Sequence, residues 1–270
     1  MNPPDKLNHS YDFDHYSELH KKEELKRLYF QATIFKQIET DHLMQLGVDS
    51  CKTVLEVGCG AGFVSGLLAD IVRHGDVHGL DSSQSLLDVA NKIVKPVHPN
   101  VAFYLADACC TGRPDACYDF VYSRMLYQHL SDPLAALREA RRVTKQDGRV
   151  CVVDVDDDWV MMYPDCPSFT KLNQLSSEFQ KNNLGDRRIG KKLPYLMQEA
   201  GFSKVRLDVK TVSSFDIDPK LFLDITVKFK AAHTQCGEAQ KLIGDIYSFV
   251  TEAKHKVLVA ASVFVVTGTV

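Results

Sequence analysis

Apolar and polar positions along the chain follow two alternating rhythms. Short runs rich in β-branched and aromatic residues predict strands at 53–57, 77–80, 101–105, 119–123 and 149–155. The stretches between them place apolar residues at helical spacing and predict helices at 62–73, 83–94, 133–143 and 189–200. Such an alternation of strands and helices predicts an α/β fold, in which a parallel sheet is wound with helices.

Two segments lie outside this alternation of strands and helices: one at the start of the chain and one after the fifth strand. Residues 21–46 show helical spacing and precede a glycine, so we expect residues 1–46 to form a helical lid on a main domain that spans 47–270. Residues 157–192 interrupt the rhythm after the fifth strand. We interpret them as a small cap that covers a substrate.

After residue 201 the pattern changes again. The sequence predicts a strand at 204–214, two helical stretches within 218–255 and a last strand at 257–270. Because the first connection is short and the second is long, these strands are expected to form an antiparallel edge of the sheet.

Composition narrows the class of partner. The 270 residues are 45% hydrophobic and 25% charged, with a net charge of −3, as in ordinary globular proteins. No global positive field attracts nucleic acid or an anionic membrane. The densest basic stretch, "GDRRIGKK" at 185–192, also contains an acid and is interpreted as a solvated face. We expect a small-molecule partner, no nucleic acid and no membrane, and the sequence does not indicate an oligomeric state.

The spacing of the cysteines and the length of the apolar runs indicate the cellular compartment. The eight cysteines form no CxxC pair, which argues against a zinc site or a disulfide framework, and several lie in apolar runs as reduced cysteines do. The opening residues are polar, and no apolar run reaches the ~18–20 residues of a membrane span. We therefore expect a cytoplasmic protein.

Three glycines at alternate positions end the first strand in "VLEVGCGAG". Gly58, Gly60 and Gly62 leave the backbone bare where the strand opens into a helix, so that a ligand can lie against main-chain N–H groups. The dinucleotide fingerprint GxGxxG needs a glycine where this chain has Phe63. Glu56 would repel a pyrophosphate but suits a ligand with an ammonium or sulfonium group.

Acidic residues end the next two strands. Asp81 follows "VHGL" and Asp107 follows "FYLA". In open α/β sheets, ligands bind at the carboxyl ends of the strands. The first acid suits the two hydroxyls of a ribose, and the second suits the exocyclic amine of a purine. Together with the glycine loop, these acids predict a site for a nucleoside-bearing ligand.

In this order the motifs resemble those of the class I S-adenosylmethionine-dependent methyltransferases, small-molecule type. "VLEVGCGAG", "VHGLDSS" and "FYLADA" are similar to the first three motifs, and "DFVYSRMLYQHLSDP" and "LREARRVTKQDGRVCVVD" to the segments around the fourth and fifth strands. The close likeness covers about residues 45–160. It implies a Rossmann-like, doubly wound sheet of seven strands, mostly parallel with an antiparallel edge strand. It also implies S-adenosylmethionine as the cofactor and S-adenosylhomocysteine as the product.

The resemblance also implies which residues hold the cofactor. The methionine moiety is expected near Glu56, Gly58, Cys59, Gly60 and Gly62, the ribose near Asp81 and Ser82, and the adenine near Asp107 and Ala108. Cys59 would fill space in the loop rather than act as a nucleophile. "HYSELHKKEELKRLYFQA" resembles the helical lid of many small-molecule members. Within it, Tyr16 and Gln31 are candidate cofactor contacts, with helix packing as the alternative for Gln31.

The segment "YSRMLYQHL" after the fourth strand supplies candidates near the reacting groups. Arg124 is a candidate for the cofactor or for a substrate carboxylate, and a packing salt bridge is its alternative. His129 is the candidate general base, needed only if the acceptor must lose a proton. Tyr127 is a second catalytic candidate and Tyr122 a substrate-binding one, with core packing as the alternative for both.

Acids cluster after the fifth strand in "DVDDDW". Strand alternation aims Asp154 and Asp156 to one side and Asp157 to the other. Asp154 and Asp156 are candidates to neutralise a cationic acceptor such as an amine or imidazole, and Trp159 would add a cation–π face. A divalent metal, as in catechol-type members, and a solvated loop are the alternatives. Because the further acids of such a metal site cannot be placed, no metal is predicted.

These features favour an enzyme (EC 2.1.1) that methylates nitrogen or oxygen of a small molecule. An RNA or protein methyltransferase is one alternative, although "YSRM" stands where many RNA enzymes carry an N/D-P-P-aromatic tetrad. A catalytically inactive methyltransferase-fold binding protein is another, and the intact glycine loop argues against it. Phe63 and Glu56 disfavour an NAD-dependent oxidoreductase.

Overall fold

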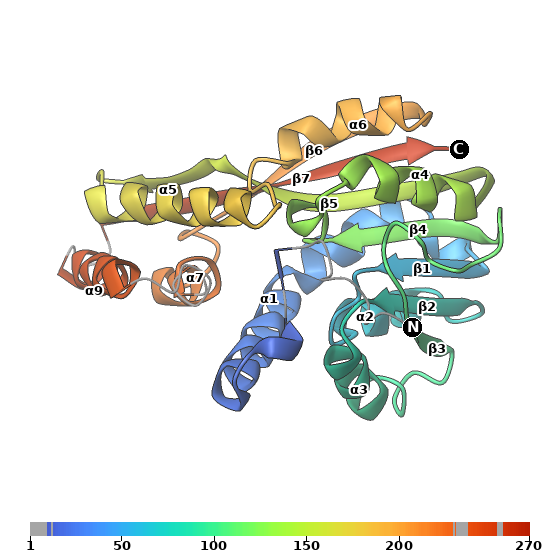
Figure 1. Cartoon of the computed structure of the whole chain (residues 1–270), viewed down its shortest axis with the longest axis horizontal. Coiled ribbons are helices and arrows are strands. Elements are labelled where there is room, and N and C mark those ends of the chain that lie inside the picture. Colours follow the sequence, from blue (N-terminus) through green and yellow to red (C-terminus); the bar gives the residue numbers. More distant parts are fainter. Residues whose placement is uncertain (1–9, 12, 229, 231–236, 253–255) are drawn as a thin grey trace.

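A seven-stranded sheet runs through the molecule (Figure 1), a computed structural model that describes all residues except 1–9, 12, 229, 231–236 and 253–255. The strands of the described chain are β1 (Thr53–Val57), β2 (Asp76–Asp81), β3 (Val101–Leu105), β4 (Tyr118–Arg124), β5 (Thr144–Tyr163), β6 (Ser203–Ser213) and β7 (Leu258–Thr269). The longer helices are α1 (Glu18–Gln45), α2 (Phe63–Ile71), α3 (Gln84–Ile93), α4 (Pro133–Val143), α5 (Pro167–Asn182), α6 (Leu193–Glu199), α7 (Pro219–Thr226) and α9 (Gly237–Glu252). Short 3₁₀ turns are η1 (Phe13–His15), η2 (Val48–Ser50), η3 (Tyr127–His129) and η4 (Gly190–Lys192).

The strand order is β3-β2-β1-β4-β5-β7-β6. The chain winds outward from β1 in one direction and from β4 in the other, so the strand order reverses between these two neighbours. Ligands of open α/β sheets bind at the carboxyl ends of the strands at such a reversal. Strands β1 to β5 pair in parallel, whereas β7 runs antiparallel to both β5 and β6. The doubly wound mixed sheet with antiparallel pairing at one edge is thereby confirmed.

Helices cover both faces of the sheet because its strands carry apolar residues on both sides. Leu137 of α4 and Met197 of α6 pack on one face. Leu43 of α1 and Leu68 of α2 pack on the other. Figure 1 shows α4 and α6 together, on the opposite side of the strands from α1 and α2. Among the described helices, none is both long enough and apolar enough to cross a membrane.

The fifth strand is longer than the predicted 149–155. It continues to Tyr163 because Val160–Tyr163 pair with Leu258–Ala261 of β7, beyond an irregularity that follows Val155. The first residues of the predicted cap insertion are therefore strand, although the division into lid, main domain and cap stays a prediction.

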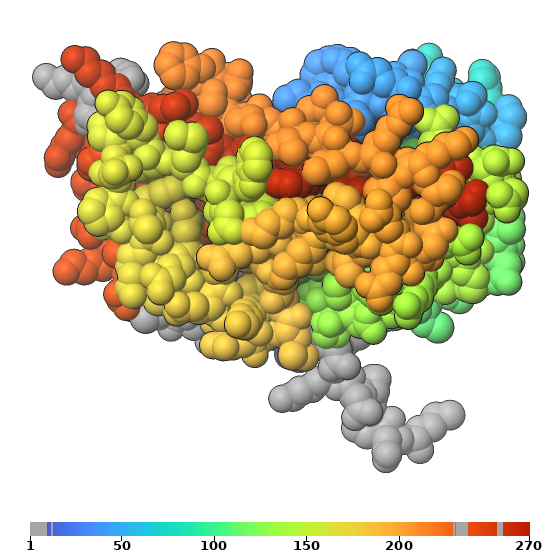
Figure 2. Space-filling view, turned by 90° about the horizontal axis from the view of Figure 1, so that it is seen from above, coloured from blue at the N-terminus to red at the C-terminus, as the bar shows by residue number. Residues whose placement is uncertain are grey.

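Helices α5, α7 and α9 pack around the far ends of β5 and β7. They share an apolar core of their own, to which Phe169, Leu172, Phe222 and Ile246 belong. Figure 1 and the view from above in Figure 2 place α5 and α9 at one end of the molecule, away from β1 to β3. From here on, the cap means this part of the structure, α5, α7 and α9 with the strand ends between them, and not the predicted insertion 157–192.

Asp119 joins the start of β1 to β4 and provides a test of this architecture. Its carboxylate accepts hydrogen bonds from the backbone N–H groups of Lys52 and Thr53, both at 2.8 Å, and from Lys145 Nζ at 2.7 Å. Partial burial opposes ionisation, yet these bonds lower the pKa of Asp119 to about 2. We expect Asp119→Ala to lower the free energy of unfolding by about 2 kcal/mol at pH 7, as measured by urea denaturation, because the donors lose their acceptor. Asp115→Ala, at an exposed ion pair with Arg142, is the control and should change stability by less than about 0.5 kcal/mol; equal effects would contradict this role.

Candidate functional site

A cavity runs from the carboxyl ends of β1 and β2, past α1, into the cap. It brings together many of the residues that the sequence singled out. These are Gln31, Glu56, Gly58, Cys59, Gly60, Asp81, Ser82, Asp107, Ala108, Arg124 and His129. Three successive strand ends, α1 and the segment after β4 therefore contribute to one site.

The glycine loop is held open by its own backbone conformation. Gly58 has a φ of 75°, and a Cβ there would lie 2.9 Å from Leu126, so only glycine fits without displacing that side chain. The N–H of Gly60 donates to Asp81 Oδ2 at 2.8 Å, which ties the loop to the end of β2. Gly62, by contrast, precedes α2 with a φ of 77° and packs against Phe103 instead of lining the cavity.

Glu56 is a carboxyl group buried at the base of the loop. It is 2% exposed, and the Ser65 hydroxyl donates a hydrogen bond to it. Burial raises its pKa to about 8, although the hydrogen bond from Ser65 opposes the shift. A cationic group placed beside it in the cavity would stabilise the ionised form.

Arg124, the last residue of β4, connects the sheet to α1. Its Nη1 donates to Glu39 of α1 at 3.1 Å, so the packing salt bridge that was the alternative role for Arg124 is present. The side chain also lines the cavity, and its Nη2 is buried without a hydrogen-bond partner among the described residues. Tyr122, a candidate substrate contact, lies elsewhere: it is 1% exposed in the core under α2 and donates to Glu39 at 2.5 Å. The substrate-binding prediction for Tyr122 is corrected accordingly.

His129 lies where Ser10 and Tyr11 meet the cavity. Its Nδ1 is 3.0 Å from the Ser10 hydroxyl, its carbonyl accepts the N–H of Ser10 at 3.0 Å, and Tyr11 packs on its ring. Tyr127 is 1% exposed in the core beneath α4, and burial raises its pKa far above the usual range. Because Tyr127 does not line the cavity, its predicted catalytic role is corrected. Tyr16 also does not line the cavity, because its ring packs against Phe13 of η1.

The acids of the run, which lie within β5, divide as strand alternation predicts, but the cavity lies on the side of Asp157. Asp154 and Asp156 are fully buried on the face away from the cavity. Asp154 accepts the N–H groups of Gln128 and Val155, and Asp156 accepts the N–H of Lys191 at 3.1 Å. Neither acid can neutralise an acceptor in the cavity, so both substrate-binding predictions are corrected.

Trp159 is also misplaced by the sequence prediction. Its side chain is half exposed outside the cavity and meets Phe264 edge to face. The proposed cation–π wall is therefore absent from the described cavity lining. Likewise, no three acidic, histidine or cysteine side chains of the described residues converge as a metal site requires.

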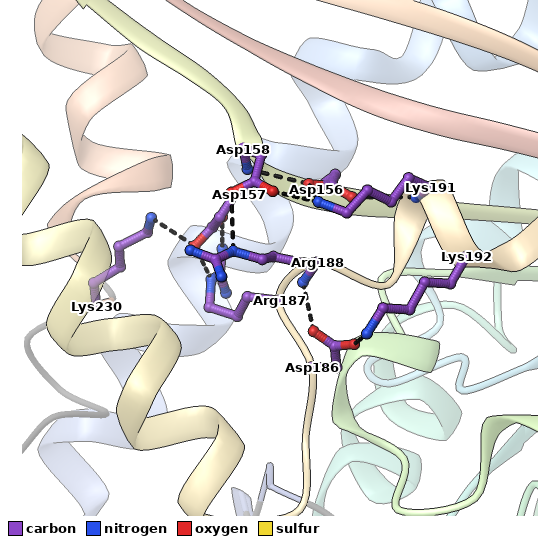
Figure 3. Close-up of polar contacts among 9 residues, drawn as sticks. All are labelled: Asp156, Asp157, Asp158, Asp186, Arg187, Arg188, Lys191, Lys192 and Lys230. Carbon is purple, nitrogen blue, oxygen red and sulfur yellow. Dashed lines mark hydrogen bonds and ion pairs between the residues drawn. The ribbon is translucent and has the colours of Figure 1, made fainter.

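Asp157 is the member of the acidic run that lines the cavity. Arg187 donates to it from Nε at 2.5 Å and from Nη2 at 2.9 Å, and Lys230 Nζ donates at 3.3 Å (Figure 3). All three side chains are at most 5% exposed. Burial alone would raise the pKa of Asp157, but the two cations lower it to about 2, so that the carboxylate is ionised.

The basic stretch 185–192 is the electrostatic partner of the acidic run. Arg187 pairs with Asp157, Arg188 with Asp158 at 2.9 Å, and Lys191 with Asp156 and Asp158 (Figure 3). The interpretation of 185–192 as a solvated face is therefore wrong for Arg187, which is buried in the cavity wall.

Sequence reasoning missed several residues of the cavity wall. Asn173, Arg187 and Lys230 come from α5, from the segment before α6 and from the residues after α7. Arg187 could have been found by matching the acidic and basic runs as partners. Asn173 and Lys230 carry no local pattern, because only the folding of the cap brings them to Asp157.

Part of the chain that forms this cavity is similar in sequence to known proteins. Residues 55–152 match the family described as a methyltransferase domain. An uncharacterised methyltransferase of Schizosaccharomyces pombe is 35% identical over 124 residues, which are 43% of this chain and 45% of that protein. A demethylmenaquinone methyltransferase of Staphylococcus saprophyticus is 27% identical over 181 residues, 61% of this chain and 76% of that protein. The chain thus spans less than half the length of the S. pombe relative.

A solved structure shows the same fold. The YcgJ protein of Bacillus subtilis superposes with a TM-score of 0.58 at 18% identity, over 85% of this chain and 98% of that one. The likeness supports the fold, a seven-stranded mixed sheet flanked by helices.

The buried carboxyl group of Glu56 makes stability depend on pH in a way that a variant can test. Its pKa is about 8 in the folded chain and near the ordinary 4.5 when unfolded, so its favourable contribution is complete below pH 4.5 and is lost as the pH rises to 8. Without a ligand, we expect Glu56→Gln to be more stable than the parent at pH 8, by on the order of 2 kcal/mol, and the difference to shrink towards pH 5.

Urea denaturation at several pH values measures this difference. Glu23→Gln, which removes an exposed carboxylate from α1, is the matched control and should follow the parent at every pH. A Glu56→Gln difference that is constant with pH would show that Glu56 is ionised in the folded chain.

Proposed function

Given that residues 55–152 form a methyltransferase domain of the class I, S-adenosylmethionine-dependent type, we propose that the protein transfers a methyl group from S-adenosylmethionine to nitrogen or oxygen of a small-molecule acceptor. One observation carries this proposal: the cavity is continuous from the glycine loop and Asp81 into the apolar cap. One end offers the groups that a nucleoside cofactor requires, and the other offers a largely apolar space for an acceptor.

The residues at the first end fit the cofactor. The buried Nη2 of Arg124 has no partner among the described residues and suits the methionine carboxylate. Glu56 suits the methionine ammonium group. Asp81 already accepts the N–H groups of Gly60 and Ser83, yet a carboxylate has about four acceptor sites and retains capacity for ribose hydroxyls. We assign Asp107 and Ala108, at the next strand end, to the adenine.

Methyl transfer asks little of the protein besides alignment and exclusion of water. S-adenosylmethionine supplies a methyl group on a positively charged sulfur, which is already activated for displacement. The chain contributes by holding both partners in line in a dry cavity. The packing of Tyr11 and Ser10 against His129 closes one side of the site. We propose His129 as the base where the acceptor must lose a proton.

The form of the cavity favours a small acceptor over RNA or protein. Phe169, Phe222 and Val160 line its cap end, and this apolar surface suits a small molecule better than a polar polymer segment. The demethylmenaquinone methyltransferase among the relatives acts on a small molecule, as its name states. A cationic acceptor loses its support, because Asp154 and Asp156 face away from the cavity. An inactive binding protein would have no need of the intact loop and of Asp81.

Cofactor binding is the direct test. We expect isothermal titration to give micromolar binding of S-adenosylmethionine and S-adenosylhomocysteine and none of NAD. Asp81→Ala should weaken binding by at least about 100-fold, because the ribose hydroxyls lose a charged acceptor. Asp88→Ala removes an exposed carboxylate from α3 and should bind as the parent does. Parent-like binding by a folded Asp81→Ala variant would refute the assignment, and binding of NAD alone would refute the function.

A further inference from the structure

The cap end of the cavity combines an apolar lining with a buried charge cluster. Most of the lining there is apolar, as in Val155, Val160, Phe169, Ile217, Phe222 and Ile225. Into this surface project Asp157, Asn173, Arg187 and Lys230, which come from four separate parts of the chain. Apolar side chains alone would suffice to form a cap core, so the cluster requires an explanation of its own.

Counted over the described side chains, the cluster carries more positive than negative charge. Arg187 and Lys230 are two cations, and Asp157 is one carboxylate between them (Figure 3). Asp154 also interacts electrostatically with Arg187, but burial raises its pKa to about 7 and backbone N–H groups occupy its oxygens. Of the other acids in the cavity lining, Glu56, Asp81 and Asp107 belong to the glycine loop and to the ends of β2 and β3. A buried net charge is unfavourable unless a counter-charge joins it.

The two cations differ in what they offer to a ligand. Arg187 directs Nε and Nη2 to Asp157 and Nη1 to Gln128 Oε1 at 3.1 Å, so it holds the cluster together. The Lys230 ammonium group has three N–H donors. Within the part of the chain that the structure describes, Asp157 and Asn173 accept from it, which leaves one donor for a group in the cavity. Burial and the nearby Arg187 lower the pKa of Lys230 to about 8, so that it remains mainly charged at pH 7.

We propose that the cap end of the cavity binds an acceptor with an apolar body and an anionic group, a carboxylate or a phosphate monoester, which Lys230 binds directly. The identity of this molecule as a methyl acceptor rests on the proposed function, whereas the preference for an anion does not. The bound anion neutralises the cluster, and the apolar body replaces water along Phe169 and Phe222. Asn173 and Asp157 orient the ammonium group, and Arg187 positions Asp157.

A series of eight-carbon probes tests the preference: octanoate, octyl phosphate, octanol and octylamine. Affinities are measured by isothermal titration at pH 7, with and without saturating S-adenosylhomocysteine. We expect octanoate or octyl phosphate to bind at least about tenfold more tightly than octanol, as one charge-assisted hydrogen bond predicts. We expect octylamine to bind most weakly. The carboxylate and phosphate probes distinguish the two sources of negative charge.

Variants locate the effect. Lys230→Met keeps the length of the side chain and should lose the preference for the anion by about tenfold, with octanol binding unchanged. Lys230→Arg should retain the preference, and Asn173→Leu should reduce it even if Lys230→Met proves unstable. Lys228→Met, at an exposed lysine two positions earlier, is the matched control. Equal affinity for charged and neutral probes, absence of binding by all of them, or tightest binding of octylamine would overturn the proposal.

The same titrations separate this proposal from the proposed function. Binding of S-adenosylhomocysteine reports on the cofactor end in every variant and should not change in Lys230→Met. A protein that prefers the anion but binds no S-adenosylhomocysteine would refute the function and leave the anion site. A protein that binds S-adenosylhomocysteine but shows no preference for the anion would refute only the anion site.

Discussion

The ion pairs between the irregular middle of β5 and the segment before α6 hold Asp157 and Arg187 together in the cavity wall and contribute its charge at the cap end. Asp157 lies beyond the parallel part of the sheet, and Arg187 reaches it from a segment thirty positions later in the sequence. A buried ion pair contributes little net stability, because desolvation offsets its attraction. Its effect here is positional: two segments that share no strand pairing are held in one arrangement. Lys230, from the cap, joins that arrangement.

The glycine loop could be predicted from the sequence because its determinants are local. Gly58 and Gly60 need particular backbone angles, and the strand and helix that flank them are short and strongly patterned. Asp81 and Asp107 follow from the same logic, since the ends of parallel strands meet at one edge. Each of these residues lines the cavity. Their placement required only the order of the elements along the chain.

The acceptor end could not be predicted in this way. From Val150 to Asp156 both faces of the strand are mostly buried, so the hydrophobic pattern does not indicate which face meets a ligand. Alternation correctly separated Asp154 from Asp157, but nothing local showed that η3 would bond the first and that Lys230 of the cap would reach the second. The predictions for Tyr122 and Tyr127 were wrong for a related reason. A tyrosine near the carboxyl end of a central strand can face the core as readily as the site. Lys230 depends entirely on tertiary packing.

The two ends of the cavity differ in charge, and this difference bears on how two ligands can share it. Glu56 lies at the glycine loop, where a cationic group would compensate a buried carboxyl group. Lys230 and Arg187 lie at the cap, where an anionic group would compensate a positive cluster. In surroundings of low dielectric such complementary charges act strongly, and they disfavour the reversed placement of either ligand. An apolar acceptor with one anionic end would therefore enter with a defined orientation, its uncharged end towards the glycine loop. Fixing that direction is the alignment on which in-line methyl transfer depends.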